Sequence, residues 1–171
     1  NRTRSGIFLK DYKILNIKGT LLDKVQLESY LEKIASDNIL QAKSSKETYP
    51  IPRLKENYEI ITQIYELLTE HIKLKIPIHP AGEWILDNYY IIEEAVKSIV
   101  KDITLKKYTN FPGIATGPYA GFARIYELAG EIVAYTDCKI DGKILPEFLK
   151  AYQSKKNLNM EEIWNIGSFI Q

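Results

Sequence analysis

The side chains that could do chemistry in this sequence are mainly carboxylates. Glu83 and Asp87 are four residues apart, so on a helix they share one face. Two carboxylates at that spacing could act as acid and base or bind a divalent ion. Acids near a helix N-terminus are also stabilised by the helix dipole, and they can pair with a basic side chain such as Arg124 on a neighbouring helix. The structural role is the stronger of the two readings, and we predict no catalytic residue in this chain.

The other reactive groups do not have the spacing of a metal or nucleophile site. His71 and His79 are eight residues apart across a proline break, which is not a metal-ligand spacing on one helix. Cys138 is the single cysteine, which excludes an internal disulfide and a cysteine-based zinc cluster. The sequence contains no glycine-rich phosphate-binding loop and no Gly-x-Ser-x-Gly motif. We therefore expect no metal site and no cofactor in this chain.

Charge and hydropathy exclude two further classes of protein. Lys plus Arg number 23 and Asp plus Glu 22, so the formal net charge is +1. A near-neutral chain has no global field to attract nucleic acid. No apolar run approaches the roughly 18–20 residues of a membrane span. The composition is that of a soluble globular domain, with no nucleic-acid partner and no membrane span expected.

Twelve tyrosines and two tryptophans raise the possibility of stacking on sugar rings or bases. Most of the tyrosines fall on apolar stripes with helical spacing, where core packing explains them more simply. A carbohydrate-binding module that uses Trp84, Tyr89 or Tyr90 to stack on glucose remains an alternative. A small enzyme that uses Glu83 and Asp87 is the other alternative.

Apolar periodicity predicts an all-α fold, an irregular bundle of about five or six helices. Asp23 with Gln26 and Asn159 with Glu162 have the spacing of capping boxes at helix starts. The polar segment 43–52 is predicted to be a mobile loop because its two prolines interrupt a helix. The predicted helices begin near residues 23, 54, 80, 117, 146 and 159.

The chain length of 171 residues fits one helical domain, which we place at residues 22–171, after an N-terminal arm at 1–21. The sequence starts without methionine and stops within an apolar helical pattern. We expect a piece of a larger protein that continues past residue 171. Trp164, Phe169 and Ile170 should then be partly exposed and available to a further domain.

Arg124 is predicted to make a buried ion pair. It lies on the most apolar helix of the chain, where an unpaired charge would cost several kcal/mol. Glu127 is one turn away, but a local pair would leave donors of the guanidinium unused. We therefore predict a contact between Arg124 and Asp87 or Glu83.

Two segments carry a resemblance to a known family. They are PAGEWILDNYYIIEE at 80–94 and GPYAGFARIYELAGEIVAYTD at 117–137. With segments 148–153 and 161–165, in this order and spacing, they resemble the N-terminal cytoplasmic region of the cyclic β-1,2-glucan synthases, large multi-domain membrane glycosyltransferases. The resemblance runs from about residue 22 to 171. The sequence departs from the family pattern at Ala123, where proline is expected, and at Cys138, where glycine or another turn residue is expected.

The resemblance implies a parent enzyme that builds β-1,2-glucan from UDP-glucose with a divalent metal, both used in another domain. It implies that this chain is non-catalytic and packs against the transferase domain that follows, with glucan as a second possible partner. The location it implies is the cytoplasmic face of the inner membrane. The residues it marks as structural or interface candidates are Glu83, Trp84, Asp87, Asn88 and Arg124.

Overall fold

The structure is a computed structural model that describes residues 21–137 and 139–171. The predicted N-terminal arm, apart from its last residue, and Cys138 lie outside the described residues. The described elements are mostly helical. In chain order they are α1 (Lys24–Asp37), β1 (Leu40–Gln41), a 3-10 turn (Lys46–Thr48), α2 (Ile51–Lys73), α3 (Pro80–Asp102), α4 (Leu105–Tyr108), β2 (Gly113–Ile114), α5 (Arg124–Thr136), α6 (Ile144–Gln153) and α7 (Met160–Ile170).

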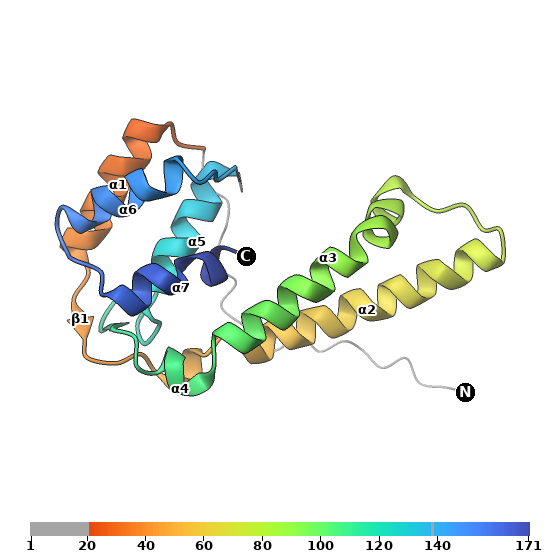
Figure 1. Cartoon of the computed structure of the whole chain (residues 1–171), viewed down its shortest axis with the longest axis horizontal. Coiled ribbons are helices and arrows are strands. Elements are labelled where there is room, and N and C mark those ends of the chain that lie inside the picture. Colours follow the sequence, from red (N-terminus) through yellow and green to blue (C-terminus); the bar gives the residue numbers. More distant parts are fainter. Residues whose placement is uncertain (1–20, 138) are drawn as a thin grey trace.

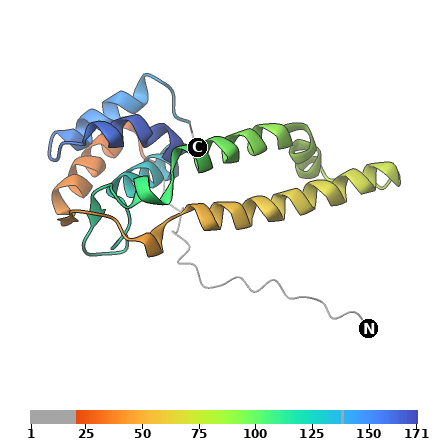
Figure 2. The same cartoon turned by 60° about the horizontal axis from the view of Figure 1, so that its bottom comes forward.

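The elements form a head and a projecting helical hairpin (Figure 1). Helices α1, α5, α6 and α7 pack together in the head, with α1 against α6 and α5 against α7. Helices α2 and α3 pack against each other and extend away from the head, as the turned view also shows (Figure 2). The all-α prediction is confirmed, and the described part has seven α-helices, of which α4 is a single turn.

The hydrophobic core lies in the head and is centred on α5. Six of the thirteen residues of α5 are buried, because its small and apolar side chains let neighbouring helices approach on several sides. Aromatic rings from α4, α6 and the connection before β2 fill the space around it. The largest fully buried apolar side chains are Tyr108, Tyr152, Phe111, Phe148, Leu27, Leu31, Ile103, Ile114, Ile125, Leu128 and Ile132.

Local sequence signals explain where several helices begin. The Asp23 side chain accepts from the backbone N–H of Gln26 (2.9 Å), and the Gln26 side chain accepts from the N–H of Asp23 (3.1 Å). Asn159 and Glu162 make the same reciprocal pair at the start of α7. These bonds satisfy backbone donors that have no partner within the helix. Both predicted capping boxes are confirmed.

Tyrosine side chains hold the two helices of the hairpin together. Tyr89 of α3 stacks on Tyr65 of α2, with ring centroids 4.0 Å apart, and on Tyr58 at 6.2 Å. Its hydroxyl lies 2.9 Å from Thr62 Oγ1. Near the outer end, a Cβ at Gly82 would lie 2.7 Å from an Ile78 methyl carbon, so glycine permits the close contact there.

The segment predicted to be a mobile loop, 43–52, is instead largely ordered by contacts with the head. Ser44 is buried, and its hydroxyl donates to the carbonyl of Tyr108 (2.6 Å). Thr48 Oγ1 lies 3.0 Å from the Tyr108 hydroxyl. Pro52 does not break the helix, because it lies in the first turn of α2, where its missing N–H would have no helical partner.

The helix predicted from Gly117 begins later, at Arg124. Gly117 and Gly121 have φ values of 88° and 86°, a left-handed conformation that does not continue a helix. The N–H of Ala123 donates to the buried Tyr108 hydroxyl (3.2 Å), and the N–H of Arg124 donates to the carbonyl of Pro112 (2.9 Å). The backbone of this segment is thus bonded to the connection before it. The prediction placed α5 about two turns too early.

A two-stranded antiparallel sheet is the only sheet among the described residues. Leu40 of β1 pairs with Ile114 of β2, and Gln41 pairs with Gly113. A sheet this small agrees with the predicted all-α fold. None of the helices in the described ranges has the length and apolar character needed to cross a membrane.

Candidate functional site

The most buried charged groups of the described residues form an ion pair between α5 and α7. Arg124 Nε donates to Glu162 Oε1 at 2.6 Å, and Arg124 Nη2 donates to Glu162 Oε2, also at 2.6 Å. Nη2 also donates to the carbonyl of Asn157 at 2.8 Å. The side chains are 6% and 0% exposed. This two-point geometry is the strongest form of arginine–carboxylate contact.

Electrostatics at this pair combine opposing effects. Burial lowers the pKa of Arg124, but the hydrogen bonds and charge of Glu162 outweigh burial, and the pKa is raised above its usual range. The Tyr152 hydroxyl is buried without a hydrogen-bond partner among the described residues. Burial raises the pKa of Tyr152 to about 12, against the positive charge of Arg124. Arg124 and Tyr152 therefore each keep one charge state near neutral pH, which suits a structural role.

The predicted partner of Arg124 was wrong. Glu83 and Asp87 are exposed on α3, in the half of that helix farthest from the head, whereas Arg124 starts α5 inside the head. Neither carboxylate has a hydrogen-bond or ion-pair partner among residues 21–137 and 139–171. The sequence revealed Glu162 only as a helix cap. Its second role depends on how α7 packs against α5, which the local pattern does not contain.

The other residues marked by the resemblance lie on the same exposed part of α3. Trp84 is 59% exposed, and the side chain of Asn88 donates to the carbonyl of Trp84 (2.8 Å). Tyr89 is enclosed in the tyrosine stack of the hairpin, whereas Tyr90 is 62% exposed. The structure therefore brings Glu83, Trp84, Asp87 and Asn88 onto one helix but joins none of them to Arg124.

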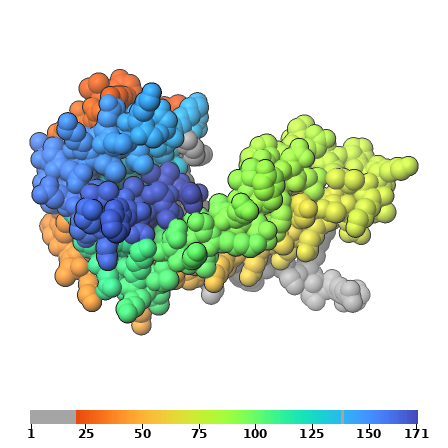
Figure 3. All heavy atoms as spheres, in the orientation of Figure 1, coloured from red at the N-terminus to blue at the C-terminus, as the bar shows by residue number. Residues whose placement is uncertain are grey.

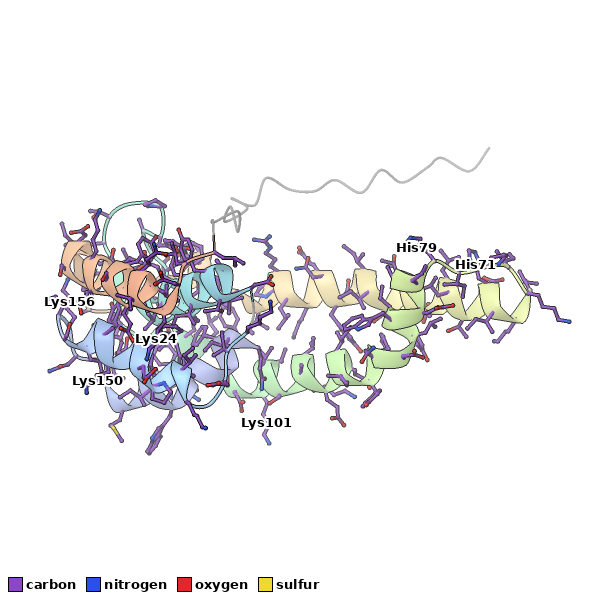
Figure 4. The ribbon with its side chains drawn as sticks, turned by 90° about the horizontal axis from the view of Figure 1, so that it is seen from above. Lys24, His71, His79, Lys101, Lys150 and Lys156 are labelled. Atoms are coloured by element: carbon purple, nitrogen blue, oxygen red, sulfur yellow. The ribbon has the colours of Figure 1, made fainter. Side chains whose placement is uncertain are left out.

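The histidines lie toward the outer end of the hairpin (Figure 4). His79 caps α3, because its Nδ1 accepts from the backbone N–H of Ala81 (3.2 Å). The backbone carbonyl of His71 accepts from the N–H of Ile76 (2.9 Å), closing the turn after α2. Within the described ranges, no three His, Cys, Asp or Glu side chains are placed to hold a metal ion.

A second group of acids, which the sequence did not mark as a site, lies farther along α5. Glu127 is buried and accepts a hydrogen bond from Asn38. Glu131, one turn on, accepts from the hydroxyls of Tyr30 (3.2 Å) and Tyr119 (3.0 Å). Burial raises the pKa of Glu127 to about 7, the Asn38 bond opposes the rise, and the nearby charge of Glu131 adds to it. This carboxyl can titrate near neutral pH.

Nine of the fifteen exposed large apolar side chains of the described residues lie on the hairpin. Figure 3 shows how far the hairpin stands out from the head. Only Ile51, Gly82 and Ile99 are fully buried in its two helices of 23 residues each. We call the exposed apolar side chains of this part the hairpin surface. Its members are Ile60, Ile64, Leu67, Ile72, Leu74, Ile76, Trp84, Tyr90 and Ile91.

The last helix is incompletely covered, as the sequence predicted. Trp164 is 77% exposed, and Phe169 and Ile170 are half-buried. The Phe169 ring packs edge-on against Phe111 at 5.8 Å and Tyr126 at 6.3 Å, so it belongs partly to the core. A contact between these residues and a further domain stays a prediction.

The head and the hairpin define an all-α protein in which the buried pair Arg124–Glu162 joins α5 to α7.

No family model matches the sequence. Over 119 residues, 70% of the chain, it is 25% identical to the cyclic β-(1,2)-glucan synthase NdvB of Rhizobium meliloti (strain 1021). The matched part spans 4% of the length of that relative. This low identity supports the relation that the two sequence segments indicated, for a small part of the synthase.

Proposed function

We propose that this chain is a non-catalytic helical part of a cyclic β-1,2-glucan synthase, which packs against and supports the part that transfers glucose. The similarity to NdvB supports the association with glucan synthesis. The arrangement of the charged groups supports the non-catalytic role. Arg124 and Glu162 join two helices, and Glu83 and Asp87 stand exposed without a shared partner among the described residues.

The hairpin surface is the observation that carries the proposal. Exposed apolar areas much larger than a few hundred Å² mark interaction sites on soluble proteins. Here two long helices cover each other on one side only, and large side chains such as Leu67 (53% exposed) and Ile72 (55% exposed) have nothing over them among the described residues. The proposed occupant is the transferase part of the same synthase, because the aligned region is only 4% of the relative's length.

The chemistry is assigned elsewhere in the synthase. In this proposal, UDP-glucose and a divalent metal bind to the transferase part, at the cytoplasmic face of the inner membrane. The described residues of this chain contribute rigidity, since the tyrosine stack and the Arg124–Glu162 pair fix the hairpin and the head. A small carboxylate-based enzyme at Glu83 and Asp87 has no supporting observation.

The test places a charge on the hairpin surface of the synthase that carries this chain. Leu67→Glu should lower β-1,2-glucan synthesis from UDP-glucose by at least about tenfold, because a carboxylate buried at the centre of an apolar interface costs several kcal/mol. Val25→Glu is the matched control, since Val25 is 69% exposed on α1 of the head. Far-UV circular dichroism of the 171-residue chain should be the same for both variants.

Two results would contradict the proposal. Full glucan synthesis by the Leu67→Glu synthase would mean that the hairpin surface is not packed against the transferase. Glucan synthesis by the isolated 171-residue chain with UDP-glucose and a divalent metal would mean that the chain is itself catalytic.

A further inference from the structure

A hollow lies where α7 passes the end of α3 and the single turn of α4. Its volume is about 380 Å³, near the lower end of the range for small-molecule pockets. Helices α3 and α7 are in contact here, so the walls come from both the hairpin and the head. The side chains that line the hollow are Asp102, Lys107, Glu161, Trp164, Asn165 and Ser168.

Trp164 supplies a flat apolar wall. Its side chain is the most exposed of the large apolar residues in the described part, at 77%. Tryptophan is highly buried on average, so such exposure beside a hollow is unusual. An indole offers a rigid apolar face and one N–H donor, and little conformational entropy is lost when a ligand covers it.

The carboxylate of Asp102 is held in place with one oxygen available. Its Oδ2 accepts from Ser168 Oγ (3.2 Å) and Ser98 Oγ (3.4 Å). No described residue donates to Oδ1. Lys107 Nζ donates to the backbone carbonyl of Asp102 (2.9 Å), which leaves two of its three N–H donors for a ligand. Donor and acceptor are thus fixed side by side.

Asn165 adds a pre-positioned amide. The residue is 6% exposed, and its Nδ2 donates to the backbone carbonyl of Glu161 (2.6 Å). Its Oδ1 has no hydrogen-bond partner among the described residues. This oxygen is not fully buried, so a ligand can reach it. An amide fixed in this way can accept a hydrogen bond without first losing side-chain freedom.

These groups select one chemical class of ligand. Two carboxylates against one ammonium leave an excess negative charge, which disfavours phosphates and other anions. A purely apolar ligand would desolvate Oδ1 of Asp102 and two N–H donors of Lys107 without replacing their bonds to water. A neutral ring with hydroxyls at its edge and an apolar face satisfies both the polar groups and the indole. We infer that this hollow binds a pyranose sugar unit, with Trp164 against its apolar face.

This inference does not depend on the proposed function, because it follows from the chemistry of the hollow alone. It moves sugar recognition away from Trp84, which does not line this hollow, to Trp164 on α7. The sequence marked Trp164 only as an interface candidate. The polar partners come from α3, α4 and α7, and only the fold brings them together.

The two tryptophans allow a direct test by NMR on the 171-residue chain. The indole N–H signals of Trp84 and Trp164 are followed during titration with glucose, the β-1,2-linked glucose disaccharide, UDP-glucose and glycerol. The Trp164 signal should shift saturably with both neutral sugars, with a dissociation constant in the millimolar range. The Trp84 signal should not shift, and glycerol and UDP-glucose should have weaker effects than glucose.

Variants assign the response to the hollow. Trp164→Ala should abolish saturable binding, measured by sugar-observed NMR, and should fold normally because the side chain is exposed. Asp102→Asn should weaken binding about tenfold, since a hydrogen bond to a charged group is lost. Met160→Ala is the matched control, being 61% exposed on the same helix but outside the hollow, and should bind as the wild type does.

Three outcomes would overturn the inference. The first is the absence of any sugar-dependent shift of Trp164, which would leave this residue as a protein contact only. The second is equal shifts of both indole signals, which would indicate a solvent effect. The third is a tighter response to UDP-glucose than to glucose, which the carboxylates of Asp102 and Glu161 should prevent.

Discussion

Replacing Arg124 by methionine removes the positive charge of the buried ion pair and keeps much of the side-chain length. Glu162 then stays at 0% exposure without its charged partner. It would keep only the backbone N–H of Asn159 (2.8 Å), which it accepts as part of the capping box. Two charge-assisted bonds of 2.6 Å and one bond to Asn157 are lost together.

The expected cost of Arg124→Met is about 3–5 kcal/mol in free energy of unfolding, as measured for buried pairs that lose one partner. A domain has only about 5–15 kcal/mol of stability in total. The variant should therefore lie near the edge of folding, and its chemical-denaturation midpoint should fall strongly. Most of this cost is the desolvated carboxylate that remains, rather than the net attraction of the pair.

A second substitution separates these two contributions. Glu162→Gln in the Arg124→Met background removes the uncompensated charge and keeps an oxygen that can accept from the N–H of Asn159. The double variant should regain about 1–3 kcal/mol over Arg124→Met alone. Urea unfolding, followed by far-UV circular dichroism, measures the free energy of unfolding of both variants. The comparison holds if the dependence of that free energy on urea concentration has the same slope for each variant. A double variant no more stable than Arg124→Met would refute the reasoning.

Three further outcomes follow from other contacts. The raised pKa of Glu127, from a usual 4.5 to about 7, means that the folded state holds this proton more tightly, so stability should fall as pH rises through that window. At 1.36 kcal/mol per pKa unit, the free energy of unfolding should fall by about 3 kcal/mol over this pH range. Urea unfolding of the Glu127→Gln variant at a series of pH values should not show this fall. Gly113→Ala should cost about 2 kcal/mol or more in thermal unfolding, because its Cβ would lie 2.6 Å from the carbonyl of Lys43. Gly167→Ala, with open space in α7, should instead stabilise by about 0.5–1 kcal/mol.

The sequence was sufficient to predict helix boundaries that depend on residues close together along the chain. The start of α1 at Lys24 and of α7 at Met160 follows from side chains three residues apart, and apolar spacing predicted α3 over Pro80–Asp102 closely. The start of α5 was missed because the glycines at 117 and 121 adopt positive φ and the backbone there bonds to other segments.

The site needed information that local patterns lack. Arg124 was correctly predicted to be buried and paired, since its surroundings on the helix are apolar. Its partner was wrong because the choice depended on which helix packs beside α5, and α3 turned out to extend into the hairpin. The burial of Glu127 was not predicted, because its partner Asn38 comes from the chain after α1, far away in the sequence.

The double role of Glu162 has a consequence for the order of events during synthesis. Arg124 leaves the ribosome 38 residues before Glu162, and at about 5–20 residues per second that interval lasts roughly 2–8 s. During this time α5 cannot settle into a finished head, because its guanidinium has no counter-charge to bury with. Once Glu162 emerges, the same carboxylate starts α7 and neutralises Arg124. This region of the nascent chain should therefore remain protease-sensitive until α7 is made, and then become resistant in one step.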